Sequence, residues 1–166
     1  IGMMVGAICR RCGAAQVIIA DLSDQRLEAA LGLGATHAVN SGKQDLEREL
    51  ARLTGGKGVD KSFECVGREV CFNQAVTALK KNGTCTAVGI YEQPLVSFPA
   101  GRLITHEIHI QGAQGYCWDF PIAIAAAREL PMERFVTHTF PLDQLQAALE
   151  TALDPAGGSI KVVVRP

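Results

Sequence analysis

Short apolar runs alternate with segments of helical periodicity along the chain. The first segment carries apolar residues at spacings of three and four, namely Met4, Val5, Ile8 and Cys12. It is expected to end at Gly13, because glycine favours the left-handed conformation that closes a helix. The apolar run over residues 17–20 is typical of a strand buried on both faces of a parallel sheet. The pattern therefore predicts a helix followed by a strand.

The same alternation continues to the end of the chain. Ser23 is expected to cap a second helix, with Gly34 just beyond its end. Further helices are expected over residues 45–53, 70–79, 120–130 and 142–153, and strands over residues 36–39, 59–65, 84–90, 104–111 and 160–164. Alternation this regular implies parallel strands with helices on both faces. The sequence predicts the α/β class, with a doubly wound parallel sheet.

The composition and charge of the chain limit the kinds of molecule that it can bind. A chain of 166 residues with 48% hydrophobic residues can bury one sizeable core. The formal net charge of −1, without a run of Lys or Arg, gives no footprint for nucleic acid or an anionic membrane surface. No apolar stretch approaches the roughly 20 residues that span a bilayer, and the start lacks the pattern of a secretory signal. We therefore expect a soluble, cytoplasmic protein with a small-molecule partner.

Cysteine and histidine give little sign of a metal site. The six cysteines are irregularly spaced, which fits reduced thiols better than a disulfide framework. Cys9 and Cys12 form a CxxC pair of the kind that can bind zinc, but a structural site needs a second close pair, and none is present. The four histidines, His37, His106, His109 and His138, are scattered. We expect no metal bound by this chain.

The candidate chemistry lies where strands become loops, since ligands of doubly wound sheets bind beyond the carboxyl ends of the strands. Asp21 ends the strand over residues 17–20. A carboxylate there can accept both hydroxyl hydrogens of an adenosine ribose and repel a 2′-phosphate, which favours NAD over NADP. The alternative is an aspartate that merely precedes a helix N-terminus, where its charge matches the helix dipole. Spacing alone leaves both interpretations open.

The chain opens with Ile1 and Gly2, followed by a helix and then Asp21. This order matches the end of a G-x-G-x-x-G fingerprint, with Gly2 as its third glycine. In that fingerprint the helix N-terminus receives the pyrophosphate of a dinucleotide. The strand that would precede Gly2 is central in such a sheet, so the fold is expected to lack its first strand.

Several motifs together resemble the cofactor domain of zinc-dependent medium-chain alcohol dehydrogenases, and most closely the sorbitol and butanediol dehydrogenase group. The motifs are Ile1-Gly2, the runs over residues 17–27 and 33–37, Gly58-Val59-Asp60, Phe63-Glu64-Cys65-Val66-Gly67 and the run over residues 112–116. The resemblance implies a dinucleotide-binding (Rossmann) domain over residues 1–134. It also implies a C-terminal segment, residues 135–166, that returns to a companion catalytic domain.

The resemblance assigns roles to individual positions. Ile1 and Gly2 would lie under the pyrophosphate, Asp21 would hold the adenosine ribose, and Arg26 would sit beside that ribose or over the adenine. The nicotinamide half of the groove would be lined by Val66, Gly67, Val88, Gly89, Ile90, Ala113, Gln114 and Gly115. The alternative for these positions is simple packing at strand ends. Tyr116 would approach the substrate, and Lys161 either meets the phosphates or only guards an edge strand.

Two departures from the family's pattern limit the roles that the resemblance can assign to this chain. Gly115 stands where sorbitol dehydrogenases place a substrate-binding arginine, and no residue matches the family's catalytic zinc ligands. The resemblance thus implies the NAD-binding portion of an oxidoreductase that moves a hydride between a secondary alcohol or polyol and NAD. Zinc would belong to the intact enzyme, and this chain alone would be inactive.

Two other classes of protein share this type of sheet. One is a non-catalytic NAD-sensing module, which the segment over residues 135–166 argues against. The other is an S-adenosylmethionine-dependent methyltransferase, which also places an acid after its second strand. A homo-oligomer, most simply a dimer, is expected through pairing of the strand over residues 104–111.

Overall fold

The computed structural model describes residues 1–154 and 157–166, and the chain forms two compact units. Unit 1 comprises residues 1–5 and 41–117, and unit 2 comprises residues 6–40 and 118–166. Helix α1 (Gly2–Arg11) contributes to both. Within the described residues, no helix combines the length and the apolar character needed to cross a membrane.

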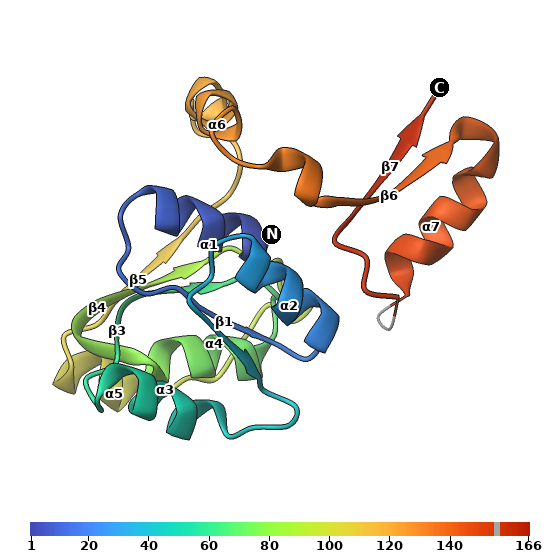
Figure 1. Ribbon diagram of the computed structural model, residues 1–166. Helices are drawn as coiled ribbons and strands as arrows, with labels where there is room; N and C mark the ends of the chain where they lie inside the picture. The colour runs from blue at the N-terminus through green and yellow to red at the C-terminus, as the bar shows by residue number, and fades with distance from the viewer. Residues whose placement is uncertain (155–156) are drawn as a thin grey trace. The chain divides into compact units, whose positions relative to one another are not determined.

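Unit 1 is built on a three-stranded parallel sheet. Its strands are β3 (Val59–Glu64), β4 (Leu79–Ala87) and β5 (His109–Gly112), hydrogen-bonded in that order (Figure 1). Parallel neighbours need a crossover, which α4 (Glu69–Thr77) provides between β3 and β4 and α5 (Ala100–Thr105) between β4 and β5. Helix α3 (Leu46–Thr54) precedes β3. The carboxyl ends of the three strands therefore meet at one edge of the sheet.

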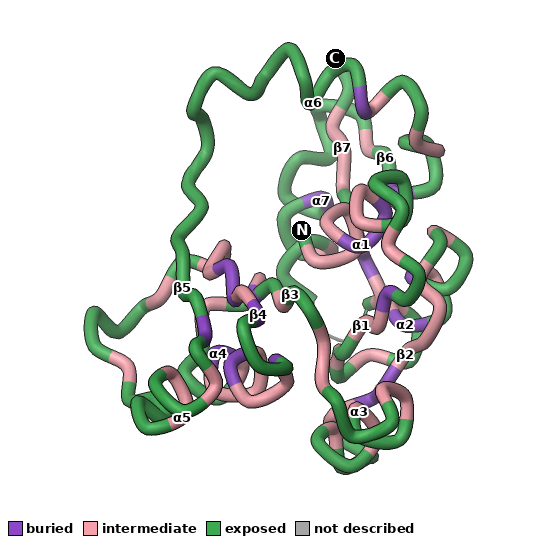
Figure 2. Tube along the Cα trace, turned by 90° about the vertical axis from the view of Figure 1, so that its left-hand side faces the viewer, coloured by how far each residue is buried: buried purple, intermediate pink, exposed green. Residues whose placement is uncertain are grey.

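The core of unit 1 lies between α4 and the sheet. Its buried members are Phe72, Val76, Leu79, Cys85 and Ile108, and Figure 2 shows buried segments on α4 and β4. The Phe72 ring also meets the rings of Tyr91 and Phe98 edge-on, at centroid distances of 6.2 and 6.0 Å. Apolar burial thus fixes the loop after β4 as well as the sheet.

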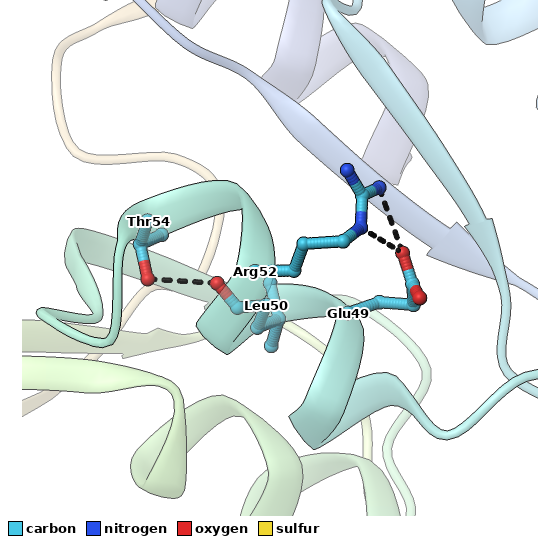
Figure 3. A network of polar contacts seen from close by, with 4 residues as sticks. All are labelled: Glu49, Leu50, Arg52 and Thr54. Atoms are coloured by element: carbon cyan, nitrogen blue, oxygen red, sulfur yellow. Dashed lines mark hydrogen bonds and ion pairs between the residues drawn. The ribbon is translucent and has the colours of Figure 1, made fainter.

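Helix α3 ends in a polar network that sets the approach to β3 (Figure 3). The Thr54 hydroxyl donates to the carbonyl of Leu50 at 2.7 Å and accepts the Gly58 amide at 3.1 Å. Arg52 donates to the Glu49 carboxylate at 2.8 and 2.9 Å one turn earlier. The threonine therefore ties the helix end to the loop that enters the sheet.

Unit 2 holds two parallel strand pairs, each with its own crossover helix. Strand β1 (Ile18–Asp21) pairs with β2 (His37–Asn40) across α2 (Asp24–Gly32). Strand β6 (Val136–Pro141) pairs with β7 (Lys161–Arg165) across α7 (Leu145–Leu153). Helix α6 (Phe120–Ala127) and the short 3₁₀ helices η1 (Met132–Arg134) and η2 (Leu142–Gln144) complete the unit.

The predicted α/β class with parallel strands is confirmed, and Ser23 caps α2 as expected. The strand predicted over residues 104–111 is wrong in its first half, because Ile104 and Thr105 end α5 and β5 begins only at His109. Arg102 explains the difference. Its guanidinium donates to the carbonyls of Thr77 and Leu79 at 2.7 and 3.0 Å, and this tertiary contact outweighs the strand preference of the β-branched residues.

Other elements also differ from the prediction. Strand β4 covers residues 79–87 rather than 84–90, so residues 88–90 form the turn after the strand. The helix expected over residues 142–153 starts as the 3₁₀ turn η2, and strand β6 was not predicted. The division at residues 134 and 135 stays a prediction.

Substitution of Leu79 tests the core of unit 1. Its side chain is fully buried, so Leu79→Ala should lower the free energy of unfolding by about 2–5 kcal/mol, measured by urea denaturation. Leu95, which is 87% exposed, supplies the matched control, and Leu95→Ala should change stability by less than about 0.5 kcal/mol. Equal effects of the two substitutions would contradict this core.

Candidate functional site

The candidate residues of unit 1 follow three neighbouring strands at one edge of the sheet. Val66 and Gly67 come after β3, residues 88–90 after β4, and Ala113 to Tyr116 after β5. The Ala113 amide donates to the Ala87 carbonyl at 2.9 Å, which carries the β4–β5 pairing one residue further. The structure therefore brings the candidates of the nicotinamide half together.

Glu64 connects the first two of these turns. Its side chain is 2% exposed, and one carboxylate oxygen accepts the amides of Val66 and Gly67 at 2.8 and 2.9 Å. The other oxygen accepts the Tyr91 hydroxyl at 2.8 Å. A buried carboxylate is costly unless it is hydrogen-bonded, and here three donors satisfy it.

The backbone of Glu64 binds the same region. Its carbonyl accepts the amides of Val88 and Gly89 at 2.8 and 3.0 Å. Tyr91 is held as a hydrogen-bond donor, since burial and the neighbouring Glu64 carboxylate both raise the pKa of its hydroxyl. One residue thus ties the turn after β3 to the turn after β4.

The two turns approach so closely that glycine is required in both. A Cβ at Gly67, where φ is +84°, would lie 2.1 Å from the Ile90 carbonyl oxygen. A Cβ at Gly89 would lie 2.2 Å from the Gly67 amide nitrogen. Packing of turn against turn therefore accounts for both glycines, whether or not a cofactor lies above them.

Large apolar side chains after these strands are exposed. Val66 is 62%, Ile90 81% and Tyr116 79% exposed, and Gln114 and Gly115 are also exposed. At the start of the chain Ile1 is exposed, and a Cβ at Gly2 would make an ordinary contact, 3.8 Å from Cys65 Cβ. Gly2 thus lies beside the end of β3, and the edge offers apolar and backbone surface to a ligand.

In unit 2, Asp21 ends β1 with its carboxylate held by the backbone. One oxygen accepts the Ser23 amide at 2.9 Å, and the side chain is half-buried. The second oxygen has no hydrogen bond within the described part of the chain. Arg26 follows on the first turn of α2, and its guanidinium has no hydrogen-bond or ion-pair partner among the described residues. The open Asp21 oxygen can accept a hydroxyl hydrogen from a ligand, whereas the Arg26 guanidinium can only donate.

Outside these positions, the described residues offer few features of a functional site. A cavity of about 530 Å³ lies at the amino ends of β3 and β4 and not at the edge that carries the candidates. Its lining includes Lys57, Lys81, Arg102 and His106. No group of three His, Cys, Asp or Glu side chains able to hold a metal occurs in residues 1–154 and 157–166. Lys161 lies exposed at the start of β7.

Comparison with known proteins places the chain in a family. Residues 1–129 match the family described as zinc-binding dehydrogenase. This chain belongs to the zinc-binding dehydrogenase family. The resemblance inferred from the motifs is therefore confirmed.

The relatives are polyol and alcohol dehydrogenases. The chain is 33% identical to D-xylulose reductase of Saccharomyces cerevisiae, with 99% of this chain and 48% of the relative covered. It is 32% identical to sorbitol dehydrogenase of Bacillus subtilis, with 100% and 48% covered. The crystal structure of 2R,3R-butanediol dehydrogenase from Bacillus subtilis superimposes with a TM-score of 0.89 at 27% identity, covering 99% of this chain and 47% of that one. The chain thus spans about half the length of these relatives, and the Rossmann-like fold is confirmed.

Glu64 lies within one of the motifs, but its hydrogen bond with Tyr91 is not predicted by the sequence. A signal was present, because an acidic residue in the apolar context of Phe63 and Cys65 must find donors if it is buried. The partner is not predictable, since Tyr91 lies 27 positions away, just beyond the strand expected over residues 84–90.

The raised pKa of Tyr91 predicts a loss of stability in alkali. The unfolded chain releases this proton near its ordinary pKa of about 10, whereas the folded chain retains it. Its contribution is therefore complete below about pH 10 and declines as the pH rises further. The urea midpoint should fall less steeply above about pH 10 in Tyr91→Phe than in the unsubstituted chain.

The thiol of Cys85 does not affect the comparison between Tyr91→Phe and the unsubstituted chain. Burial raises the pKa of its thiol as well, but this contribution is present in both proteins and cancels. Parallel pH profiles of the two proteins would show that the Tyr91 hydroxyl does not hold its proton through folding.

Proposed function

We propose that this chain binds NAD as the cofactor-binding half of a zinc-dependent oxidoreductase. The whole protein would transfer a hydride between a secondary alcohol or polyol and the nicotinamide ring. The observation that carries the proposal is Asp21, a strand-end carboxylate with one oxygen fixed by the Ser23 amide and the other open to a ligand. Family membership supports it.

The charge of Asp21 supports NAD over NADP. A carboxylate accepts the two vicinal hydroxyls of an adenosine ribose, whereas a 2′-phosphate at the same place would be repelled. Arg26 would lie beside that ribose or over the adenine. Ile1 and Gly2, at the N-terminus of α1, would meet the pyrophosphate.

The nicotinamide half would rest on the edge of the unit 1 sheet. Its lining would be Val66, Gly67, Val88, Gly89, Ile90, Ala113, Gln114 and Gly115. These residues would orient the ring through backbone and apolar contacts, and the bound nicotinamide supplies the hydride chemistry. Tyr116 would approach the substrate.

The catalytic zinc would be held outside this chain. In such enzymes zinc acts as a Lewis acid on the alcohol oxygen. No residue of this sequence matches the family's catalytic zinc ligands, so we expect no turnover by this chain alone. The substrate class follows the relatives named for sorbitol and xylulose, and a cytoplasmic location stays a prediction from sequence.

Titration with NADH and NADPH tests the proposal. By calorimetry the chain should bind NADH more tightly than NADPH, and Asp21→Asn should reduce this preference at least about tenfold, because a hydrogen bond to a charged group is worth about 1.5–3 kcal/mol. Asp45→Asn is the matched control, since Asp45 likewise accepts a backbone amide, that of Arg48, at a helix start. Absence of NADH binding, or a preference for NADPH, would refute the assignment.

We also propose a dimer through β5. This strand is the edge of the unit 1 sheet, all its residues are exposed, and an exposed edge is a template for pairing. Sedimentation should show a dimer, and Ile110→Lys should dissociate it, because edge charges oppose strand pairing. Ile104→Lys, at an exposed isoleucine of α5, should leave the dimer intact. A monomer at all concentrations would exclude this interface.

A further inference from the structure

We propose that Glu64 is a positioning residue that sets the nicotinamide end of the cofactor groove through Tyr91. This rests on the proposed function, because it assumes that the turns after β3 and β4 face NAD. We use the name "turn lock" for Glu64, Tyr91 and the amides of Val66, Gly67, Val88 and Gly89.

The turn lock concentrates five donors on one residue. Three reach the carboxylate and two reach the carbonyl, all at 2.8–3.0 Å. The carboxylate is 2% exposed, so water cannot replace a donor that is lost. The geometry of both turns therefore depends on the charge and reach of this side chain.

Tyr91 transmits that constraint to the residues after β4. It follows Ile90 directly, and its ring packs edge-on against Phe72 of α4 while its hydroxyl donates to Glu64. The Ile90 carbonyl in turn lies against Gly67, where no Cβ can fit. Loss of the hydroxyl should loosen Ile90 and Gly89 while the ring remains packed.

Asp21 shares none of these hydrogen bonds. The adenosine contact proposed for Asp21 in unit 2 thus does not depend on the hydrogen bonds of the turn lock in unit 1. Damage to the turn lock should weaken contacts with the nicotinamide and spare contacts with the adenosine. A residue that merely stabilises the fold would not separate the two.

The experiment compares NADH with ADP-ribose, which lacks the nicotinamide ring. Affinities are measured by calorimetry on the 166-residue chain and on Tyr91→Phe and Glu64→Gln. NADH affinity should fall roughly tenfold in each variant, the change that about 1.4 kcal/mol produces, while ADP-ribose affinity stays within about twofold. The fluorescence of bound NADH, which reports the ring's surroundings, should change in parallel.

Glu49→Gln is the matched control. Glu49 is also a hydrogen-bonded glutamate of unit 1, but its partner is Arg52 of α3 (Figure 3). This variant should bind both ligands as the unsubstituted chain does. Circular dichroism verifies the fold of every variant, and if Glu64→Gln does not fold, Tyr91→Phe decides, because it keeps the ring and removes only the hydroxyl.

The outcomes separate this inference from the proposed function. If the unsubstituted chain binds neither ligand, the proposed function fails and the inference fails with it. If it binds both, and the variants weaken both equally or neither, NAD binding stands and the positioning role is overturned. Selective loss of NADH affinity in folded variants supports the turn lock.

Discussion

The buried carboxylate of Glu64 is the constraint on which the candidate edge of unit 1 depends. A charged group in the interior is tolerated only where donors replace its lost water, and here the donors come from the turns after two different strands. The parallel register that brings Glu64 opposite Ala87 makes this possible. Sheet pairing thus places the strand ends side by side, and the carboxylate then fixes the chain beyond them.

The two acids at strand ends, Glu64 and Asp21, differ in the number of protein donors that their carboxylates accept. Glu64 directs its carboxylate inward, where both oxygens accept protein donors. Asp21 accepts the Ser23 amide with one oxygen, and its other oxygen has no hydrogen bond among the described residues. Position after a strand therefore does not identify a ligand-binding acid by itself. The number of donors that the protein itself supplies is what distinguishes the two acids in this structure.

Periodicity was sufficient for most of the fold, because parallel strands and their crossover helices carry distinct apolar patterns. It failed at residues 104–105, where the contacts of Arg102 with the carbonyls of Thr77 and Leu79 extend a helix that local preference opposes. It also missed β6, whose exposed positions outnumber its half-buried ones. Long-range polar contacts such as that between Glu64 and Tyr91 leave no periodic trace, so the site's interior support had to come from the structure.

The close packing of the two turns changes the interpretation of the glycines in the motif. Gly67 and Gly89 resemble the close-approach glycines of a cofactor groove, but the atoms that a Cβ would meet within 3 Å belong to the protein: the backbone of Ile90 at Gly67, and the backbone of Gly67 with a carboxylate oxygen of Glu64 at Gly89. Even without a ligand, an added Cβ at either position would collide with the other turn. The motif glycines therefore preserve the packing of the two turns, whereas the second carboxylate oxygen of Asp21 has no hydrogen bond among the described residues. The glycines thus report on the fold, and the proposed choice of dinucleotide rests on a different residue, Asp21.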